Sequence, residues 1–124
     1  MVNLGNHFKS YEFQCPCGQC KELIIDCRLI EYLEALRLRV ELPIRITSGY
    51  RCRGYQSTLR EHNINTALGT SQHELGMAAD ISIEGMSGPQ LELILRDMGI
   101  KAVGVADRWV HFDLRADKER RWTY

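Results

Sequence analysis

Two histidines and one aspartate lie in sequence contexts that suit metal ligands. His73 and Asp80 belong to the segment Ser-Gln-His-Glu-Leu-Gly-Met-Ala-Ala-Asp at 71–80, and His111 follows about thirty residues later in Trp-Val-His-Phe-Asp at 109–113. Three nitrogen and oxygen ligands leave the fourth position of zinc open, as in catalytic sites, whereas structural zinc is closed by four ligands that are usually rich in cysteine. This set of residues therefore indicates hydrolytic chemistry at a zinc ion.

The hydrophobic pattern predicts two strands that carry two of these ligands. From Ala79 onward, and again over 109–114, apolar and polar residues alternate with the period of two that is typical of a half-buried strand. Asp80 and His111 then lie on the faces turned away from the core. His73 falls on the loop before the first strand, where a glycine and small apolar residues favour a turn, and we expect it to reach the same cleft.

The motif Ser-x-His-x-x-Gly-x-Ala-x-Asp at 71–80, followed by a strand with apolar-His-x-Asp, resembles the zinc D-alanyl-D-alanine carboxypeptidase family and the related peptidoglycan endopeptidases and phage lysins. Similar stretches run along nearly the whole chain. They include the N-terminal entry at 7–13, the Ser-Gly-Tyr-Arg motif within 46–52 and the closing segment at 113–122.

The resemblance implies roles for particular residues and a substrate. It implies that His73, Asp80 and His111 bind one catalytic zinc, that Arg51 binds a substrate carboxylate or nearby carbonyl, and that Ser71 lies near the substrate. The reaction it implies is hydrolysis of peptide bonds in peptidoglycan stem peptides, as a carboxypeptidase or an endopeptidase. Zinc in such a site lowers the pKa of water and polarises the scissile carbonyl.

The general base is the part of the family pattern that this sequence does not match. Some members carry Glu three residues before the last ligand and others His two residues before it, but these positions hold Arg108 and Trp109. Asp113 and Asp107 are the carboxylates nearest in sequence to His111, so both are base candidates, although Asp113 could instead orient a ligand. Trp109 is a candidate for lining the substrate cleft, with packing between strands as its alternative. Without an effective base, the alternative function is a zinc-binding, catalytically weak or inactive cell-wall-binding relative.

A cluster of cysteines raises the question of a second metal. Cys15, Cys17, Cys20 and Cys27 lie close together near the start of the chain, and Cys52 follows the arginine motif. The first four could close a structural zinc site, but Cys-x-Cys-x-x-Cys lacks the repeated Cys-x-x-Cys knuckles of a zinc ribbon. The odd total of 5 cysteines argues against complete internal disulfide pairing. Reduced thiols are the default in a cytosolic chain, with disulfides after release and the second metal as alternatives.

Composition bounds the remaining possibilities. With 16 basic and 16 acidic residues the chain carries no charge excess that would favour nucleic acid or an anionic membrane surface. Its 124 residues suit one domain, 1–124, with the cysteine-rich segment 1–27 packed on it, and we expect a monomer. No apolar run approaches the roughly twenty residues of a membrane span. The start lacks a signal-peptide pattern, so we expect synthesis in the cytoplasm and, for a wall substrate, release by a phage-type route.

The sequence pattern predicts an α+β fold in which helices flank a mainly antiparallel sheet, and the family resemblance implies a fold like that of hedgehog domains and DD-peptidases. Capping residues, apolar stripes and Gly or Pro breaks define the expected elements. Two neighbouring strands near the end of the chain are expected to form an antiparallel hairpin. The expected elements are a helix from the Asp26 cap to about Val40, a strand at 44–47, a helix at 54–62, a loop at 63–70, a helix from 87 to 98, and strands at 102–105 and 109–114.

Overall fold

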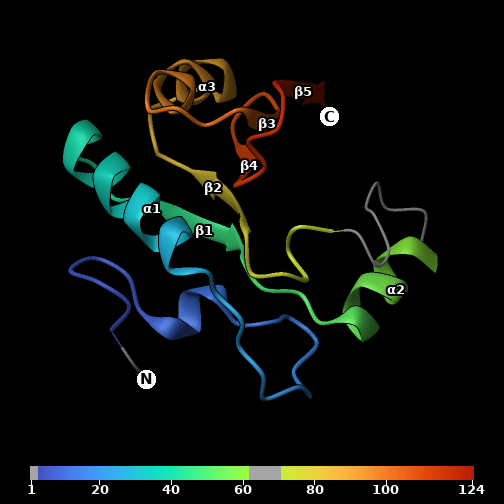
Figure 1. Cartoon of the computed structure of the whole chain (residues 1–124). Helices are drawn as coiled ribbons and strands as arrows, with labels where there is room; N and C mark the ends of the chain where they lie inside the picture. Colours follow the sequence, from blue (N-terminus) through green and yellow to red (C-terminus); the bar gives the residue numbers. More distant parts are fainter. Residues whose placement is uncertain (1–2, 62–70) are drawn as a thin grey trace.

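Helices and strands alternate irregularly along the chain, and the strands join into one sheet (Figure 1). The computed structural model describes residues 3–61 and 71–124. Within these residues the elements are η1 (Ser10–Phe13), α1 (Cys27–Val40), β1 (Arg45–Ser48), α2 (Arg53–Glu61), β2 (Ala78–Ser82), α3 (Gly88–Asp97), β3 (Ala102–Val105), β4 (Val110–Asp113) and β5 (Arg120–Thr123).

The sheet has the strand order β1-β2-β4-β3-β5. All neighbouring strands are antiparallel except β3 and β5, which run parallel. The expected hairpin between β3 and β4 is confirmed, with Val105 opposite Val110 at its closed end. The fold is therefore α+β with a mostly antiparallel sheet, as the sequence pattern predicts.

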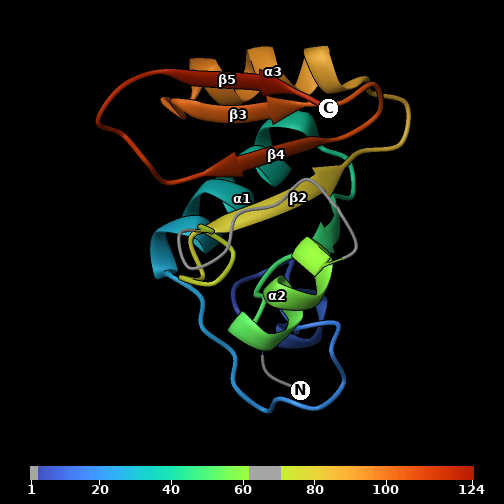
Figure 2. The same cartoon turned by 90° about the vertical axis from the view of Figure 1, so that its right-hand side faces the viewer.

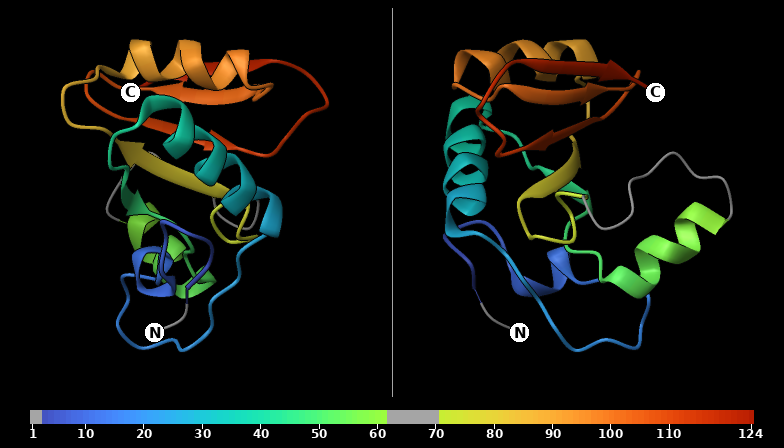
Figure 3. Two further views of the ribbon diagram at one scale, coloured as in Figure 1. Left: turned by 90° about the vertical axis from the view of Figure 1, so that its left-hand side faces the viewer. Right: turned by 45° about the vertical axis from the view of Figure 1, so that its right-hand side comes forward.

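Helices α1 and α3 cover one face of the sheet. The left view in Figure 3 looks onto this helical face, and Figure 2 looks onto the opposite face, with α1 and α3 behind the strands and α2 in front. The apolar stripes of both helices join the inward side chains of the strands in one core. Its fully buried members include Leu33 and Leu36 of α1, Leu95 of α3, Ile81 of β2 and Phe112 of β4.

The helix starts are capped as the sequence predicts. The Asp26 side chain accepts a hydrogen bond from the backbone N–H of Arg28 at 2.9 Å, and Ser87 forms a reciprocal capping box with Gln90 at the start of α3. Such caps satisfy backbone N–H groups that have no partner inside the helix. The expected helix at 54–62 corresponds to α2 as far as Glu61, while the rest of it and the expected loop at 63–70 lie outside the described residues.

The segment before α1 packs against the rest of the domain. Phe8 and Phe13 are buried in the core, and the backbone N–H of Tyr50 donates to the Phe13 carbonyl at 2.9 Å. This contact joins η1 to the loop that follows β1, which carries Arg51. Among the described helices, none is long and apolar enough to cross a membrane.

Candidate metal centre

His73, Asp80 and His111 converge on the face of the sheet opposite α1 and α3. Each offers one ligand atom, and these atoms all lie within 4.8 Å of one another. Asp80 Oδ1 is 2.9 Å from His111 Nδ1 and 3.2 Å from His73 Nε2. All three side chains are buried. The structure therefore brings together the three residues that were expected to bind metal, although the sequence separates them by up to 38 positions (111 − 73).

Strand register explains how residues from five strands reach one site. A single row crosses the sheet, in which Ser48 is opposite Asp80, Asp80 is opposite His111, and Gly104 is opposite both His111 and Trp122. Residues directly opposite on paired strands project to the same face and lie within side-chain contact. The alternation of apolar and polar residues that buries Ile81 and Phe112 thus also sets Asp80 and His111 side by side.

Hydrogen-bond acceptors lie on the outer edges of both imidazole rings. His73 Nδ1 lies 2.7 Å from the carbonyl oxygen of Gly49, and His111 Nε2 lies 2.8 Å from Asp113 Oδ2. Both partners are acceptors, so they favour the neutral tautomers in which these two nitrogens carry the protons. In the neutral rings, the lone pairs are then on His73 Nε2 and His111 Nδ1, the atoms that face Asp80.

In these neutral tautomers three acceptors meet at one point with no donor among them: two imidazole lone pairs and one carboxylate oxygen of Asp80. Such a set is satisfied by a cation. Two nitrogen ligands and one oxygen ligand match the three-ligand donor sets of catalytic zinc, and histidine ligands commonly donate their second N–H to a carboxylate or backbone carbonyl. The residues present fit zinc in both respects.

Local electrostatics favour the protonation states that bind metal at His73 and Asp80. Burial lowers the pKa of His73, which keeps its ring neutral. Burial alone would raise the pKa of Asp80, but the neighbouring imidazole rings of His111 and His73, when protonated toward it, hold that pKa below its usual range. Burial also opposes charge on His111, yet the neighbouring carboxylates of Asp113 and Asp80 raise its pKa above the ordinary value. A metal ion therefore competes with a proton chiefly at His111.

Asp113 lies on the outer edge of the His111 ring. It is fully buried, its Oδ2 receives Arg115 Nη2 at 2.9 Å, and its Oδ1 receives Arg115 Nε at 2.8 Å and the Arg115 backbone N–H at 3.1 Å. Burial acts to raise its pKa, but His111 and Arg115 hold that pKa at about 2. Asp113 contacts Nε2 of the His111 ring, whereas Nδ1, on the other edge of the ring, faces Asp80. Of its two expected roles, this geometry favours orienting a ligand.

Asp107, the second base candidate, lies in the turn between β3 and β4. Its side chain is 96% exposed and pairs only loosely with Arg108, at 3.9 Å. Its backbone carbonyl accepts from Gly88 N–H at 2.8 Å. Asp107 is not a member of the group formed by the three converging ligands. The turn was predicted correctly, but the structure does not bring this carboxylate to the site.

Arg51 and Ser71 border the cluster in different ways. Arg51 Nη2 donates to Asp80 Oδ2 at 3.1 Å and Arg51 Nε donates to Ser48 Oγ at 2.9 Å, and 15% of the arginine side chain is exposed. Its backbone N–H donates to the His73 carbonyl at 3.2 Å. Ser71 is buried, and its hydroxyl accepts from the backbone N–H of His73 at 3.2 Å. Arg51 therefore contacts a ligand at the edge of the site, while Ser71 shapes the turn that carries His73.

Aromatic residues near the end of the chain pack beside the site, and one of them, Trp122, was not among the expected site residues. Trp122 packs against His111, with 5.2 Å between the ring centroids, and Arg115 lies over the Trp122 ring at 5.8 Å. Trp109 packs against Tyr124, with 4.6 Å between the ring centroids and an angle of 34° between the ring planes. Burial raises the pKa of Tyr124, and the charge of Asp80 adds to that rise. The signal for Trp122 was a glycine inside β3, because a strand glycine often marks a close approach.

Gly104 provides the space in which Trp122 lies against His111. A Cβ at this position would sit 2.3 Å from Trp122 Nε1 and 2.5 Å from its Cε2. We therefore expect Gly104→Ala to displace the indole and lower the free energy of unfolding by about 1–3 kcal/mol, as overpacking does. Chemical denaturation measures this. Gly54→Ala is the matched control, because its Cβ meets only Cys52 Sγ at 3.9 Å. The control should leave stability unchanged or raise it by up to about 1 kcal/mol; equal stabilities for both variants would contradict the packing role of Gly104.

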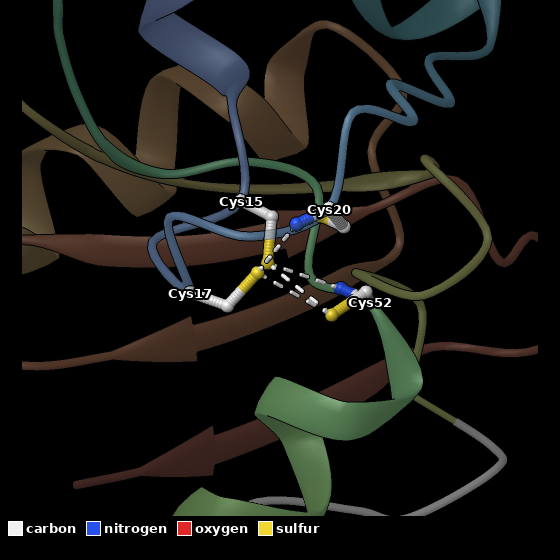
Figure 4. Close-up of side chains that lie close together, drawn as sticks. All are labelled: Cys15, Cys17, Cys20 and Cys52. Carbon is white, nitrogen blue, oxygen red and sulfur yellow. Dashed lines mark hydrogen bonds between the residues drawn. The ribbon is translucent and has the colours of Figure 1, made fainter.

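The cysteine cluster differs from the expected set in one member. Cys15, Cys17, Cys20 and Cys52 lie together (Figure 4). Cys27 is instead exposed, as the first residue of α1. Cys27 is close to the first three in sequence, but it is not a member of the group. Cys52 reaches the group because the loop after β1 packs against the N-terminal segment.

Comparison with known proteins agrees with the geometry of the site. A family model described as Peptidase M15 matches residues 6–113, a range that contains the arginine motif and all three converging ligands. No curated protein and no solved structure matched the chain. Peptidases of this family depend on zinc. The matched range spans most of the 124 residues, and the chain therefore belongs to the Peptidase M15 family.

Proposed function

We propose that this protein is a zinc metallopeptidase that hydrolyses peptide bonds in peptidoglycan stem peptides. The observation that carries the proposal is the convergence of His73 Nε2, Asp80 Oδ1 and His111 Nδ1, three acceptors whose geometry is fixed by outer hydrogen bonds. Membership of the Peptidase M15 family supports peptide hydrolysis as the reaction. The bond is either that of a terminal D-amino acid, for a carboxypeptidase, or one within the stem or cross-link, for an endopeptidase.

The protein's own residues contribute to this reaction mainly by holding and orienting. His73, Asp80 and His111 would hold the zinc, which when bound polarises a carbonyl oxygen and lowers the pKa of water. The Gly49 carbonyl and Asp113 keep the two imidazole rings in the tautomers that zinc requires. Arg51 presents its planar guanidinium at the edge of the site, where it would bind a carboxylate or carbonyl of the stem peptide.

One observation favours a second candidate function, that of a zinc-binding relative with weak or no hydrolysis. Among the described residues, no further carboxylate, histidine or cysteine joins the three ligands, and Asp113 is occupied by Arg115 and His111. A general base typically contributes a hundredfold to ten thousandfold in rate. A site without one would retain metal and bind wall peptides while turning them over slowly.

Defined wall peptides distinguish the two functions. Purified protein is incubated with a stem pentapeptide and with a cross-linked dimer, each with and without a zinc chelator, and the products are identified by mass. Hydrolysis that stops with chelator and returns with added zinc supports the peptidase, and the product masses identify the bond. Zinc-dependent binding of the peptides without any product supports the alternative function.

Arg51→Ala should impair hydrolysis more than it impairs metal binding. We expect kcat/KM to fall at least about tenfold, equivalent to about 1.4 kcal/mol of lost transition-state binding, in protein saturated with zinc. Arg51→Lys should restore little, because a point charge does not reproduce the planar fork that bonds Ser48 and Asp80. Steady-state kinetics and zinc content measure the two effects. Unchanged kcat/KM in Arg51→Ala at saturating zinc would exclude a role in substrate binding. If that variant also binds zinc more weakly, the role of Arg51 is to hold the ligand Asp80.

A further inference from the structure

Four thiols gather outside the candidate metal centre, where the N-terminal segment meets the loop after β1. The sulfur atoms of Cys15, Cys17, Cys20 and Cys52 all lie within 4.8 Å of one another, and all four point into the same small space (Figure 4). Sγ of Cys52 is 3.6 Å from that of Cys15 and 3.8 Å from that of Cys17. In a tetrahedral zinc site with Zn–S bonds of about 2.3 Å, neighbouring sulfurs are about 3.8 Å apart. The spacing of these thiols therefore suits four ligands around one ion.

Backbone N–H groups are aimed at three of the four sulfur atoms. Cys52 N–H donates to Cys15 Sγ at 3.3 Å, while Cys20 N–H at 3.3 Å and Gln19 N–H at 3.4 Å donate to Cys17 Sγ. Tyr55 N–H donates to Cys52 Sγ at 3.4 Å. Donors around sulfur stabilise the thiolate, which is the form that binds metal.

Local backbone conformation supplies these donors. Gly18 adopts a φ of 73°, a left-handed conformation that lets the chain turn tightly between Cys17 and Cys20. Cys52 directly precedes α2, so its sulfur lies at the positive end of a nine-residue helix. The site is thus built from one Cys-x-x-Cys turn, a third cysteine two residues before it, and a fourth from a helix start that is distant in sequence.

We propose that Cys15, Cys17, Cys20 and Cys52 bind a second zinc ion in a closed, structural site. Four thiolates fill all positions of tetrahedral zinc, which distinguishes this site from the open set of His73, Asp80 and His111. The ion would link the segment after η1 to the residue next to Arg51, across the junction where Tyr50 N–H bonds the Phe13 carbonyl. Its role is therefore to hold the arginine-bearing loop in place, and it stands independently of the proposed peptidase activity.

Metal content per chain tests the proposal directly. Protein produced in zinc-supplemented medium and purified with a reductant is dialysed, and zinc and iron are measured by elemental mass spectrometry. We expect two zinc ions in the wild type, one in the Cys17→Ser/Cys20→Ser variant and one in the His73→Ala/His111→Ala variant. Cys27→Ser is the matched control, because this exposed cysteine lies outside the cluster, and it should keep two. The same zinc content in the Cys17→Ser/Cys20→Ser variant as in the wild type, or iron in place of the second zinc, would overturn the proposal.

A measurement on a variant with intact cysteines guards against misfolding of the cysteine variant. Cobalt replaces zinc in the His73→Ala/His111→Ala protein, which leaves the cysteine cluster as the remaining site. An intense sulfur-to-cobalt charge-transfer band with tetrahedral d–d bands is the expected result, and their absence would refute a four-thiolate site. Thiol titration of the denatured wild type should find all five cysteines reduced. A count of three or one would show disulfides in place of the ion. Because none of these measurements uses peptide hydrolysis, their failure is distinct from failure of the peptidase proposal.

Discussion

Replacing both His73 and His111 by alanine is expected to remove the metal from the candidate centre and abolish peptide hydrolysis. The double variant leaves Asp80 as the single member of the converging group, and one carboxylate oxygen does not hold zinc against dialysis. Hydrolysis of the stem peptides should fall to the level of a buffer control, since the reaction depends on the ion. Product formation by mass spectrometry and zinc content after dialysis measure the two losses in the same preparation.

His7→Ala is the matched control for this experiment. His7 is an exposed histidine whose ring pairs with Glu34 at 2.6 Å, and it is not a member of the converging group. Its loss should leave zinc content and turnover as in the wild type. Zinc at the cysteine cluster would persist in the His73→Ala/His111→Ala variant, so the expected change is the loss of one ion. An unchanged total, together with unchanged hydrolysis, would show that the reaction occurs elsewhere on the protein.

The part of the site that could be predicted from sequence is the part encoded by residue type and period. Asp80 and His111 alternate with the apolar residues that build the core, and this alternation alone predicts that both lie on the face turned away from the core. The helix that follows the Asp26 cap and ends at Val40 is equally predictable, because a capping residue precedes a continuous apolar stripe. Elements whose local sequence preference agrees with the tertiary fold are the ones that sequence predicts best.

What sequence reasoning missed depends on contacts between distant segments. The partner of His73 is the Gly49 carbonyl, and a backbone carbonyl has no residue-type signature. Proximity along the chain predicts Cys27 as the fourth member of the cysteine cluster, whereas the loop after β1 brings Cys52 to the cluster. Trp122 reaches His111 from β5 across Gly104, and the parallel pairing of β5 with β3 that permits this is not encoded in the short sequence of either strand.

Asp113 has two expected roles, and its contacts favour that of a group that orients a ligand. Both oxygens of this carboxylate are bonded, and it meets the His111 ring at the edge away from Asp80. Its pKa is held at about 2, below the ordinary value of 3.8, so the carboxylate is ionised throughout the neutral range. Because the folded-state pKa is depressed, the stability that Asp113 contributes is present above about pH 4 and is lost as the pH falls toward 2. A buried carboxylate that is ionised at neutral pH and contacts the outer edge of the His111 ring is suited to orienting that ring rather than to exchanging protons with substrate.

Asp113→Asn is therefore expected to weaken zinc binding at the candidate centre by about ten to a hundredfold, as loss of a partner that orients a ligand typically does. The amide removes the negative charge that favours a proton on His111 Nε2, and its own N–H₂ can donate to that nitrogen and move the proton to Nδ1, the atom that must bind metal. Competition with a zinc-sensitive dye measures the affinity, and kinetics over a range of free zinc show whether excess metal restores turnover.

The kinetic comparison separates the two roles of this residue. For an orienting group, high free zinc should recover most of the turnover of Asp113→Asn, whereas for a general base zinc affinity would stay normal and turnover would remain at least about a hundredfold low at any zinc concentration. Asp107→Asn is the matched control, since the same charge is removed from a side chain that is 96% exposed in the β3–β4 turn. It should bind zinc and turn over like the wild type. If Asp113→Asn instead shows normal affinity with a turnover that zinc does not restore, the carboxylate takes part in proton transfer, and the ring-edge geometry must change when substrate binds.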